Sequence, residues 1–82
     1  MIHILYFAHF RELLGQSEEK MAANHATVSD LLAELATRGN DWKCTLVDNG
    51  QLQIAVNHNV ASRETPIKAG DEIAFFPPVT GG

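Results

Sequence analysis

The end of the sequence offers unusual main-chain chemistry, because two prolines are followed closely by two glycines. Glycine has no Cβ, so another backbone or a ligand can approach Gly81 and Gly82 closely. Pro77 and Pro78 cannot donate to a sheet and favour an extended conformation. From Pro77 onward the chain can therefore reach up to ~20 Å from a folded domain. We expect this stretch to carry the main-chain carboxylate of Gly82 into the narrow active site of another protein.

The reactive side chains elsewhere do not combine into a catalytic or metal-binding pattern. Cys44 is the sole cysteine, and Lys43 beside it points elsewhere because consecutive helix residues diverge. We therefore expect a structural cysteine, and a stand-alone cysteine enzyme is a distant alternative. The histidines lack metal-ligand spacing and are expected to be ordinary surface or strand residues: His3, His9, His25 and His58. No Gly-rich phosphate loop precedes a helix, so we expect the chain alone to bind no metal and no cofactor.

Length and charge narrow the classes of partner. Eighty-two residues form one domain, and a net charge of −4 argues against binding nucleic acid. The acidic balance instead suits basic patches on other proteins. A single cysteine fits a reducing compartment, and the apolar run from Ile2 to Ala8 is too short for a membrane span. We expect a cytoplasmic protein without membrane or nucleic-acid partners.

The first third of the chain predicts a strand, a short helix and a second strand. Residues 2–7 are rich in β-branched and aromatic types, with both faces apolar, which indicates a central or partly covered strand. Residues 10–14 can form about one helical turn, which Gly15 ends. Residues 18–23 then return as an edge strand.

The main helix has the clearest pattern. Thr27 is a suitable N-cap with Asp30 three residues later, and Gly39 is expected to end the helix. Asp41 is expected to cap a second short helix over residues 42–47. The apolar stripe of the main helix falls at helical spacing: Val28, Leu31, Leu32 and Leu35.

The last third predicts three strands, over residues 52–56, 60–61 and 72–76. Asp71 and Glu72 are expected in a solvated turn, and Arg63 is expected to be solvated by default. Together the elements predict an α+β domain, in which a mixed sheet has one main helix packed on one face. This is the element order of a ubiquitin-like β-grasp fold, with the domain at residues 1–76 and a flexible, extended C-terminal tail at residues 77–82.

The face of the sheet away from the helix predicts a docking surface. Because side chains alternate along a strand, Ile73 and Phe75 share one face and Phe76 lies on the other. Phe7 is expected beside Phe76, with Val60 nearby. An exposed apolar patch next to a tail suits partner binding. For Val60, a place in the core is an equally open alternative.

The tail Phe-Phe-Pro-Pro-Val-Thr-Gly-Gly at residues 75–82 resembles the C-terminus of the small, sulfur-carrying subunit of molybdopterin synthase. Residues 6–8, running into Arg11, Glu12 and Leu13, resemble the N-terminus of the same family. The turn at residues 70–72 also matches, so the resemblance spans the whole chain.

The resemblance implies a β-grasp fold and a chain that is not catalytic by itself. A ubiquitin-activating-like adenylyltransferase would use ATP to form a transient AMP adduct at Gly82. A persulfide donor would then supply sulfur, leaving a thiocarboxylate on Gly82 beside Gly81. The large catalytic subunit of the synthase, in a two-plus-two heterotetramer, would use that sulfur to convert cyclic pyranopterin monophosphate into molybdopterin. The implied partner-binding residues are Phe7, Val60, Phe76, Pro77, Pro78, Val79 and Thr80.

Two other functions use the same fold and terminal glycine. One is the sulfur carrier of thiamine synthesis, although the Phe-Pro-Pro-Val sequence favours the molybdenum pathway. The other is a ubiquitin-like modifier joined to lysine side chains, for which Gly82 would be found linked to lysines in cell extracts.

Overall fold

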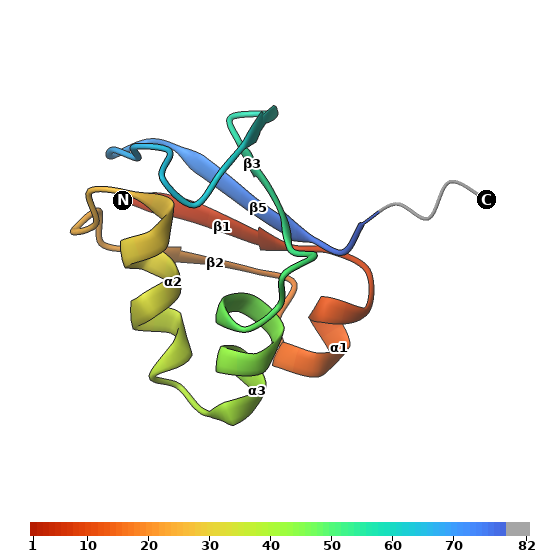
Figure 1. The fold of residues 1–82 in the computed structure, drawn as a ribbon. Coiled ribbons are helices and arrows are strands. Elements are labelled where there is room, and N and C mark those ends of the chain that lie inside the picture. Colours follow the sequence, from red (N-terminus) through yellow and green to blue (C-terminus); the bar gives the residue numbers. More distant parts are fainter. Residues whose placement is uncertain (79–82) are drawn as a thin grey trace.

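The structure, a computed structural model, describes residues 1–78. In this part of the chain five strands form one mixed sheet, and the helices lie together on one of its faces (Figure 1). None of the helices described is long and apolar enough to cross a membrane. The elements in chain order are β1 (Ile2–Tyr6), α1 (His9–Leu14), β2 (Glu18–Met21), α2 (Val28–Ala36), α3 (Asn40–Trp42), η1 (Lys43–Val47), β3 (Gln53–Val56), β4 (Asn59–Ala61) and β5 (Glu72–Phe76).

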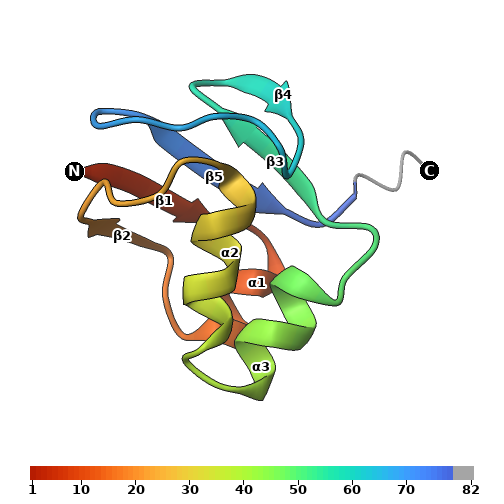
Figure 2. The same ribbon diagram turned by 60° about the vertical axis from the view of Figure 1, so that its left-hand side comes forward.

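The first and last strands lie side by side within the sheet. The strand order is β2-β1-β5-β3-β4, so β1 is flanked on both sides, as its two apolar faces predicted. β1 pairs with β5 in parallel, and the remaining pairs are antiparallel. Figure 2 shows β1 and β5 running together behind α2. Because the two strands are parallel, the residues that follow them leave from the same end of the sheet.

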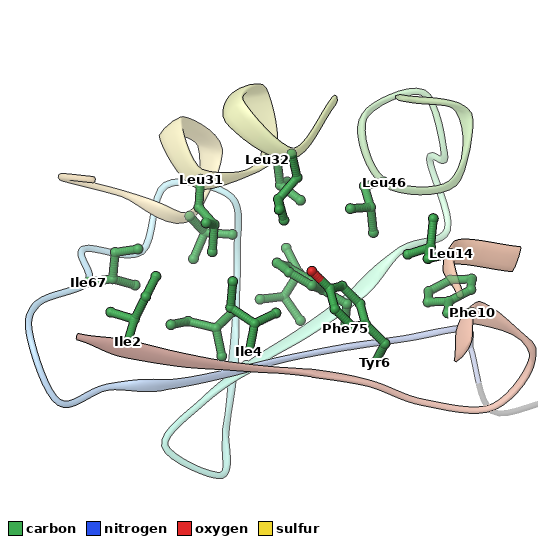
Figure 3. Packing of buried hydrophobic residues seen from close by; sticks show 14 residues of the cluster. Ile2, Ile4, Tyr6, Phe10, Leu14, Leu31, Leu32, Leu46, Ile67 and Phe75 are labelled. Atoms are coloured by element: carbon green, nitrogen blue, oxygen red, sulfur yellow. The ribbon is translucent and has the colours of Figure 1, made fainter. Parts of the chain in front are cut away.

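The core lies between the sheet and α2. The predicted stripe on α2 is fully buried, and Leu31 and Leu32 point from the helix toward Ile4 and Phe75 on the sheet (Figure 3). Alternation along β1 buries one residue in two, which matches the predicted strand periodicity. The buried residues of β1 and β5 are Ile2, Ile4, Tyr6, Ile73 and Phe75.

The N-terminus of α2 is capped as the sequence predicted. The Thr27 hydroxyl Oγ1 accepts a hydrogen bond from the Asp30 amide at 3.3 Å, which satisfies one of the free amides at the helix start. The Asp30 carboxylate accepts from the Ala26 amide at 3.3 Å, one residue before the position that a capping box uses. α2 ends at Ala36 with Thr37 as its C-cap, before Gly39, the residue predicted to stop the helix.

The second helical segment differs in its start and in its winding. Gly39, with a φ of 150°, occupies the N-cap position of α3, so Asp41 lies inside the helix and caps nothing. The winding then widens in η1, where the Asp48 amide donates to the Lys43 carbonyl at 2.9 Å across five residues. In this wider turn two consecutive residues are buried, Thr45 and Leu46.

Asp71 is buried, so the expected solvated turn is wrong for this residue. Its exposed fraction is 5%, and its oxygens accept from the Asn57 side-chain amide at 3.0 Å and from the Lys68 main-chain amide at 2.9 Å. These two hydrogen bonds, the Asn57 bond foremost, hold the pKa of the Asp71 carboxyl below its usual range. Burial opposes them with a smaller effect. Asp71 therefore fixes the start of β5 to the turn after β3.

Arg63 is also a structural residue, contrary to the default of simple solvation. Its guanidinium donates to the main-chain carbonyls of Leu46 at 3.1 Å and Asn49 at 3.0 Å. Carbonyls at a helix C-terminus lack partners within the helix, and here a side chain distant in sequence supplies the donor.

A polar network joins the edge strand β2 to the helical layer. The Glu19 carboxylate accepts two hydrogen bonds from Arg38, both at 2.7 Å, and one from the Tyr6 hydroxyl at 2.8 Å. Arg38 also lies 4.6 Å from the centre of the Trp42 ring. Burial raises the pKa of Glu19, but hydrogen bonds from Arg38 and then Tyr6 outweigh it, so this pKa lies below its usual value. Burial, followed by the Glu19 bond, raises the pKa of Tyr6 well above its usual range.

Candidate functional site

The face of the sheet opposite the helices carries a row of small and aliphatic side chains. Register places Leu5 of β1 opposite Ala74 of β5, Ala74 opposite Ala55 of β3, and Ala55 opposite Val60 of β4. Opposed residues in neighbouring strands point to the same face, so four strands contribute to one apolar row. Val60 is 88% exposed, so the alternative that it fills the core is wrong.

Two aromatic residues extend this row toward the end of the sheet. Tyr6 is opposite Phe75 in the parallel pair, and the Phe7 amide donates to the Phe75 carbonyl at 3.1 Å. Phe7 and Phe76 therefore follow side by side on the outer face, as their alternation predicted. Phe7 is 46% exposed and Phe76 is half-buried. We call this surface the outer patch, made of Leu5, Phe7, Ala55, Val60, Ala74 and Phe76.

A pocket of about 250 Å³ opens in the outer patch. It is too large to be a packing defect and has room for one large apolar side chain. The sequence placed Phe7 and Phe76 here, and alternation along the strands also gives Leu5 and Ala74. The pocket is lined by Leu5, Phe7, Ala55, His58, Glu72, Ala74 and Phe76.

Sequence reasoning missed the polar edge of this pocket. His58 Nε2 lies 3.7 Å from Glu72 Oε1, and both residues line the pocket. The turn that carries His58 has two consecutive non-glycine residues with positive φ, 52° at Asn57 and 71° at His58. Positive φ at both central residues is typical of the two-residue turn that joins the strands of a hairpin. The sequence signal that could have revealed this edge is the two-residue connection between β3 and β4, because so tight a turn keeps His58 beside the sheet.

The chain leaves β5 next to Phe7. Pro77 is half-buried and Pro78 is exposed. Both line a second pocket, of about 400 Å³, together with His9, Phe10, Asn49 and Gln51. The predicted roles of Val79, Thr80, Gly81 and Gly82 lie outside the described residues. The binding roles of Phe7, Val60, Phe76, Pro77 and Pro78 stay predictions.

Cys44 lies on η1, within the predicted short helix, but its side chain is exposed and takes no part in the core. Its Sγ lies 3.7 Å from the Asn40 side-chain oxygen. Over residues 1–78, no three or more His, Cys, Asp or Glu side chains gather in a way that could hold a metal ion.

The mixed five-stranded sheet with its main helix across one face is the ubiquitin-like β-grasp fold. A solved structure of a putative molybdopterin converting factor, subunit 1, from Pyrococcus furiosus has this fold, with a TM-score of 0.76 at 34% identity. It covers 95% of this chain, which covers 97% of that one. The predicted fold is therefore confirmed.

The chain belongs to the ThiS family, which it matches over residues 4–82. It is 45% identical to the molybdopterin synthase sulfur carrier subunit of Escherichia coli K12 over 82 residues, covering 100% of each chain. The identity to the subunit of the same name from Haemophilus influenzae is 42%, again with 100% of each chain covered. The resemblance to this family, first indicated by the tail, is confirmed.

Two further relatives bear on partners. A structure of the complex between subunits 1 and 2 of molybdopterin-converting factor from Helicobacter pylori matches with a TM-score of 0.68 at 28% identity. It covers 99% of this chain, which covers 97% of that one. Small archaeal modifier protein 3 of Haloferax volcanii is 31% identical, with 99% of this chain and 98% of that protein covered.

Proposed function

We propose that this protein is the sulfur carrier subunit of a molybdopterin synthase. The observation that carries the proposal is full-length similarity, at 45% and 42% identity, to two proteins of that name. The outer patch supports it, because an exposed apolar surface beside the start of the tail suits a domain that docks and inserts its terminus. The patch contains two phenylalanines, a residue type enriched at protein–protein interfaces.

The partner for the outer patch is the large catalytic subunit of the synthase. The Helicobacter pylori complex supports this assignment, since it joins two subunits of molybdopterin-converting factor and one of them matches this fold. Docking covers Phe7 and Phe76, which lie beside the point where the chain leaves β5. The tail then reaches the active site of the large subunit, where residues of that subunit carry out the reaction.

The chemistry needs two activation steps at the Gly82 carboxylate. A carboxylate resists attack because oxide is a poor leaving group. Its oxygen attacks the α-phosphorus of ATP on an adenylyltransferase, pyrophosphate leaves, and the acyl adenylate forms. The terminal sulfur of a protein persulfide then attacks the acyl carbon and AMP leaves. A second thiol of the donor then attacks the donor's own cysteine sulfur in the acyl disulfide. The sulfur–sulfur bond to the acyl group breaks, a disulfide forms within the donor, and the thiocarboxylate is released.

A thiocarboxylate suits a carrier without catalytic groups. It is more acidic than an alkyl thiol, so it is anionic and nucleophilic at neutral pH without help from a neighbouring base. The domain then needs only to dock and to deliver its terminus, while the partners supply catalysis. Two loaded carriers provide the two sulfurs of each dithiolene.

Intact-mass spectrometry of the protein from cells with an active pathway tests the proposal. The expected species has one sulfur in place of one terminal oxygen. The loaded protein, mixed with the large subunit, should then convert the pyranopterin precursor into the dithiolene product. A protein that never carries sulfur, or a loaded protein that forms no product, would refute the assignment.

A second candidate function is modification of other proteins, favoured by the 31% identity to small archaeal modifier protein 3. The same activated Gly82 would then react with lysine amines instead of a persulfide. Peptide mapping of cell extracts distinguishes the two, because a modifier leaves Gly82 in an isopeptide bond to lysine. A carrier leaves unattached thiocarboxylate.

A further inference from the structure

The polar edge of the outer patch is formed by a histidine and a carboxylate that lie next to each other. His58 Nε2 and Glu72 Oε1 are 3.7 Å apart beside the apolar pocket. We propose that the outer patch binds its partner with uptake of a proton, which His58 holds against Glu72. This inference rests on the proposed function, since it describes how the same surface docks.

A partner bound at the outer patch would remove water from the side-chain carboxylate of Glu72. Glu72 is the first residue of β5, and its side chain, 32% exposed, lines the pocket with Ala74 and Phe76. Its main-chain amide donates to the Asn57 side-chain oxygen at 3.0 Å. Its carbonyl accepts from the Asn57 amide at 2.8 Å. The backbone of Glu72 is thus fixed, and an apolar side chain entering the pocket must come close to its carboxylate.

The free protein gains little from this pair. The His58 side chain is 86% exposed, and an ion pair in water contributes only about 0–1 kcal/mol. Docking changes the balance, because a carboxylate that loses water without gaining a partner is costly. A protonated His58 supplies the missing positive charge from a turn that already holds it over Glu72. Histidine side chains ordinarily titrate near pH ~6.5, so the required proton is available close to neutrality.

The other charged or titratable groups around this pair are His3, Lys20 and Asp71, and none of them lines the pocket. His3 of β1 is opposite Glu72 in register, but its Nε2 lies 3.6 Å from Glu18 on the edge strand β2. Lys20, also on β2, is opposite His3 and exposed. Asp71 is buried and hydrogen-bonded to Asn57 and to the Lys68 amide. Neither His3 nor Lys20 lines the pocket.

Calorimetry with the cognate large subunit tests the proposal, using the full chain in its unloaded carboxylate form. Titrations at pH 6.5 in buffers with different ionisation enthalpies measure the number of protons taken up. A proton held ten times more tightly in the complex makes the affinity about sixfold higher at pH 6 than at pH 8. Titratable groups of the large subunit are common to all variants, so they cancel in the comparison.

Three substitutions locate the proton. Glu72→Gln and His58→Gln should each remove the added proton uptake and the rise in affinity toward pH 6. Glu72→Gln keeps the main-chain bonds to Asn57. His3→Gln, on the same face of the sheet, is the matched control and should retain the uptake. Equal proton uptake by the natural protein and Glu72→Gln, or its loss in His3→Gln, would overturn the inference.

Failure of the inference and failure of the proposed function give different results. Equal changes in affinity between pH 6 and pH 8 for the natural protein and Glu72→Gln would overturn the proton uptake and leave the carrier assignment intact. Absence of any complex, by native mass spectrometry at either pH, would overturn both.

Discussion

Replacing Phe7 by alanine should weaken docking strongly while leaving the domain folded. An aromatic side chain of this kind covers ~200 Å², and 46% of Phe7 is open to water, so a partner can bury ~90 Å² of it. At ~25 cal/mol per Å² this burial contributes about 2 kcal/mol, or about 30-fold in Kd. The cost to folding is smaller than for a buried phenylalanine, because about half of the ring is already exposed.

Leu13→Ala is the matched control for this prediction. Leu13 is a large apolar residue of similar exposure, 52%, but it lies on α1 outside the outer patch. Isothermal titration with the large subunit gives Kd for both variants, and thermal unfolding reports their stability. The reasoning would be refuted if Phe7→Ala bound within threefold of the natural protein. It would also be refuted if Leu13→Ala lost as much affinity.

Three other changes probe the tail and the fold. Deleting Gly82 should leave docking intact but abolish sulfur transfer, because the carboxylate retreats by ~3.3 Å; product formation by this variant would contradict delivery at Gly82. Because the pKa of Glu19 is lowered in the fold, the stability from this group is present above pH ~4.5 and is lost as pH falls through the lowered pKa. Arg38→Met should cost about 1–3 kcal/mol at pH 7 and flatten that acid loss in thermal unfolding, and an unchanged pH profile would exclude the pair as its cause. Ala8 joins β1 to α1 with φ 55° and ψ −138°, so Ala8→Gly should relieve strain and raise stability by about 0.5–2 kcal/mol in urea unfolding; a loss would show that the alanine is unstrained.

Periodicity predicted the features that depend on local alternation. The stripe on α2 and the opposite faces of Phe75 and Phe76 follow from 3.6-residue and two-residue repeats, and the Thr27 cap follows from the residue types at the start of the helix. The order of elements then restricted the fold to few solutions. Such reasoning works because each residue's neighbours along the chain decide which face it occupies.

Features that depend on contacts between residues far apart in the chain could not be predicted from the sequence. The residues next to Asp71 predict a solvated turn, and only the structure shows that it accepts a hydrogen bond from Asn57, 14 residues away. Arg63 reads as solvated until its carbonyl partners in Leu46 and Asn49 are known. His58 lines the pocket because its turn has positive φ angles, and a histidine in the sequence does not predict such a backbone conformation. Each case requires a contact between segments whose approach no local pattern encodes.

The docking aromatics are fixed by the same register that builds the core. In β1 and β5 an inward aromatic, Tyr6 or Phe75, is followed at once by an outward one, Phe7 or Phe76. A slip of one residue in either strand would exchange the faces and bury the outer aromatic in place of the inner one. The Glu19 bond to the Tyr6 hydroxyl opposes such a slip in β1, because the slip would carry the hydroxyl away from the Glu19 carboxylate. The hydrogen bond between Tyr6 and Glu19 therefore also keeps Phe7 on the outer face. The stability of the core and the geometry of the outer patch are linked in this way.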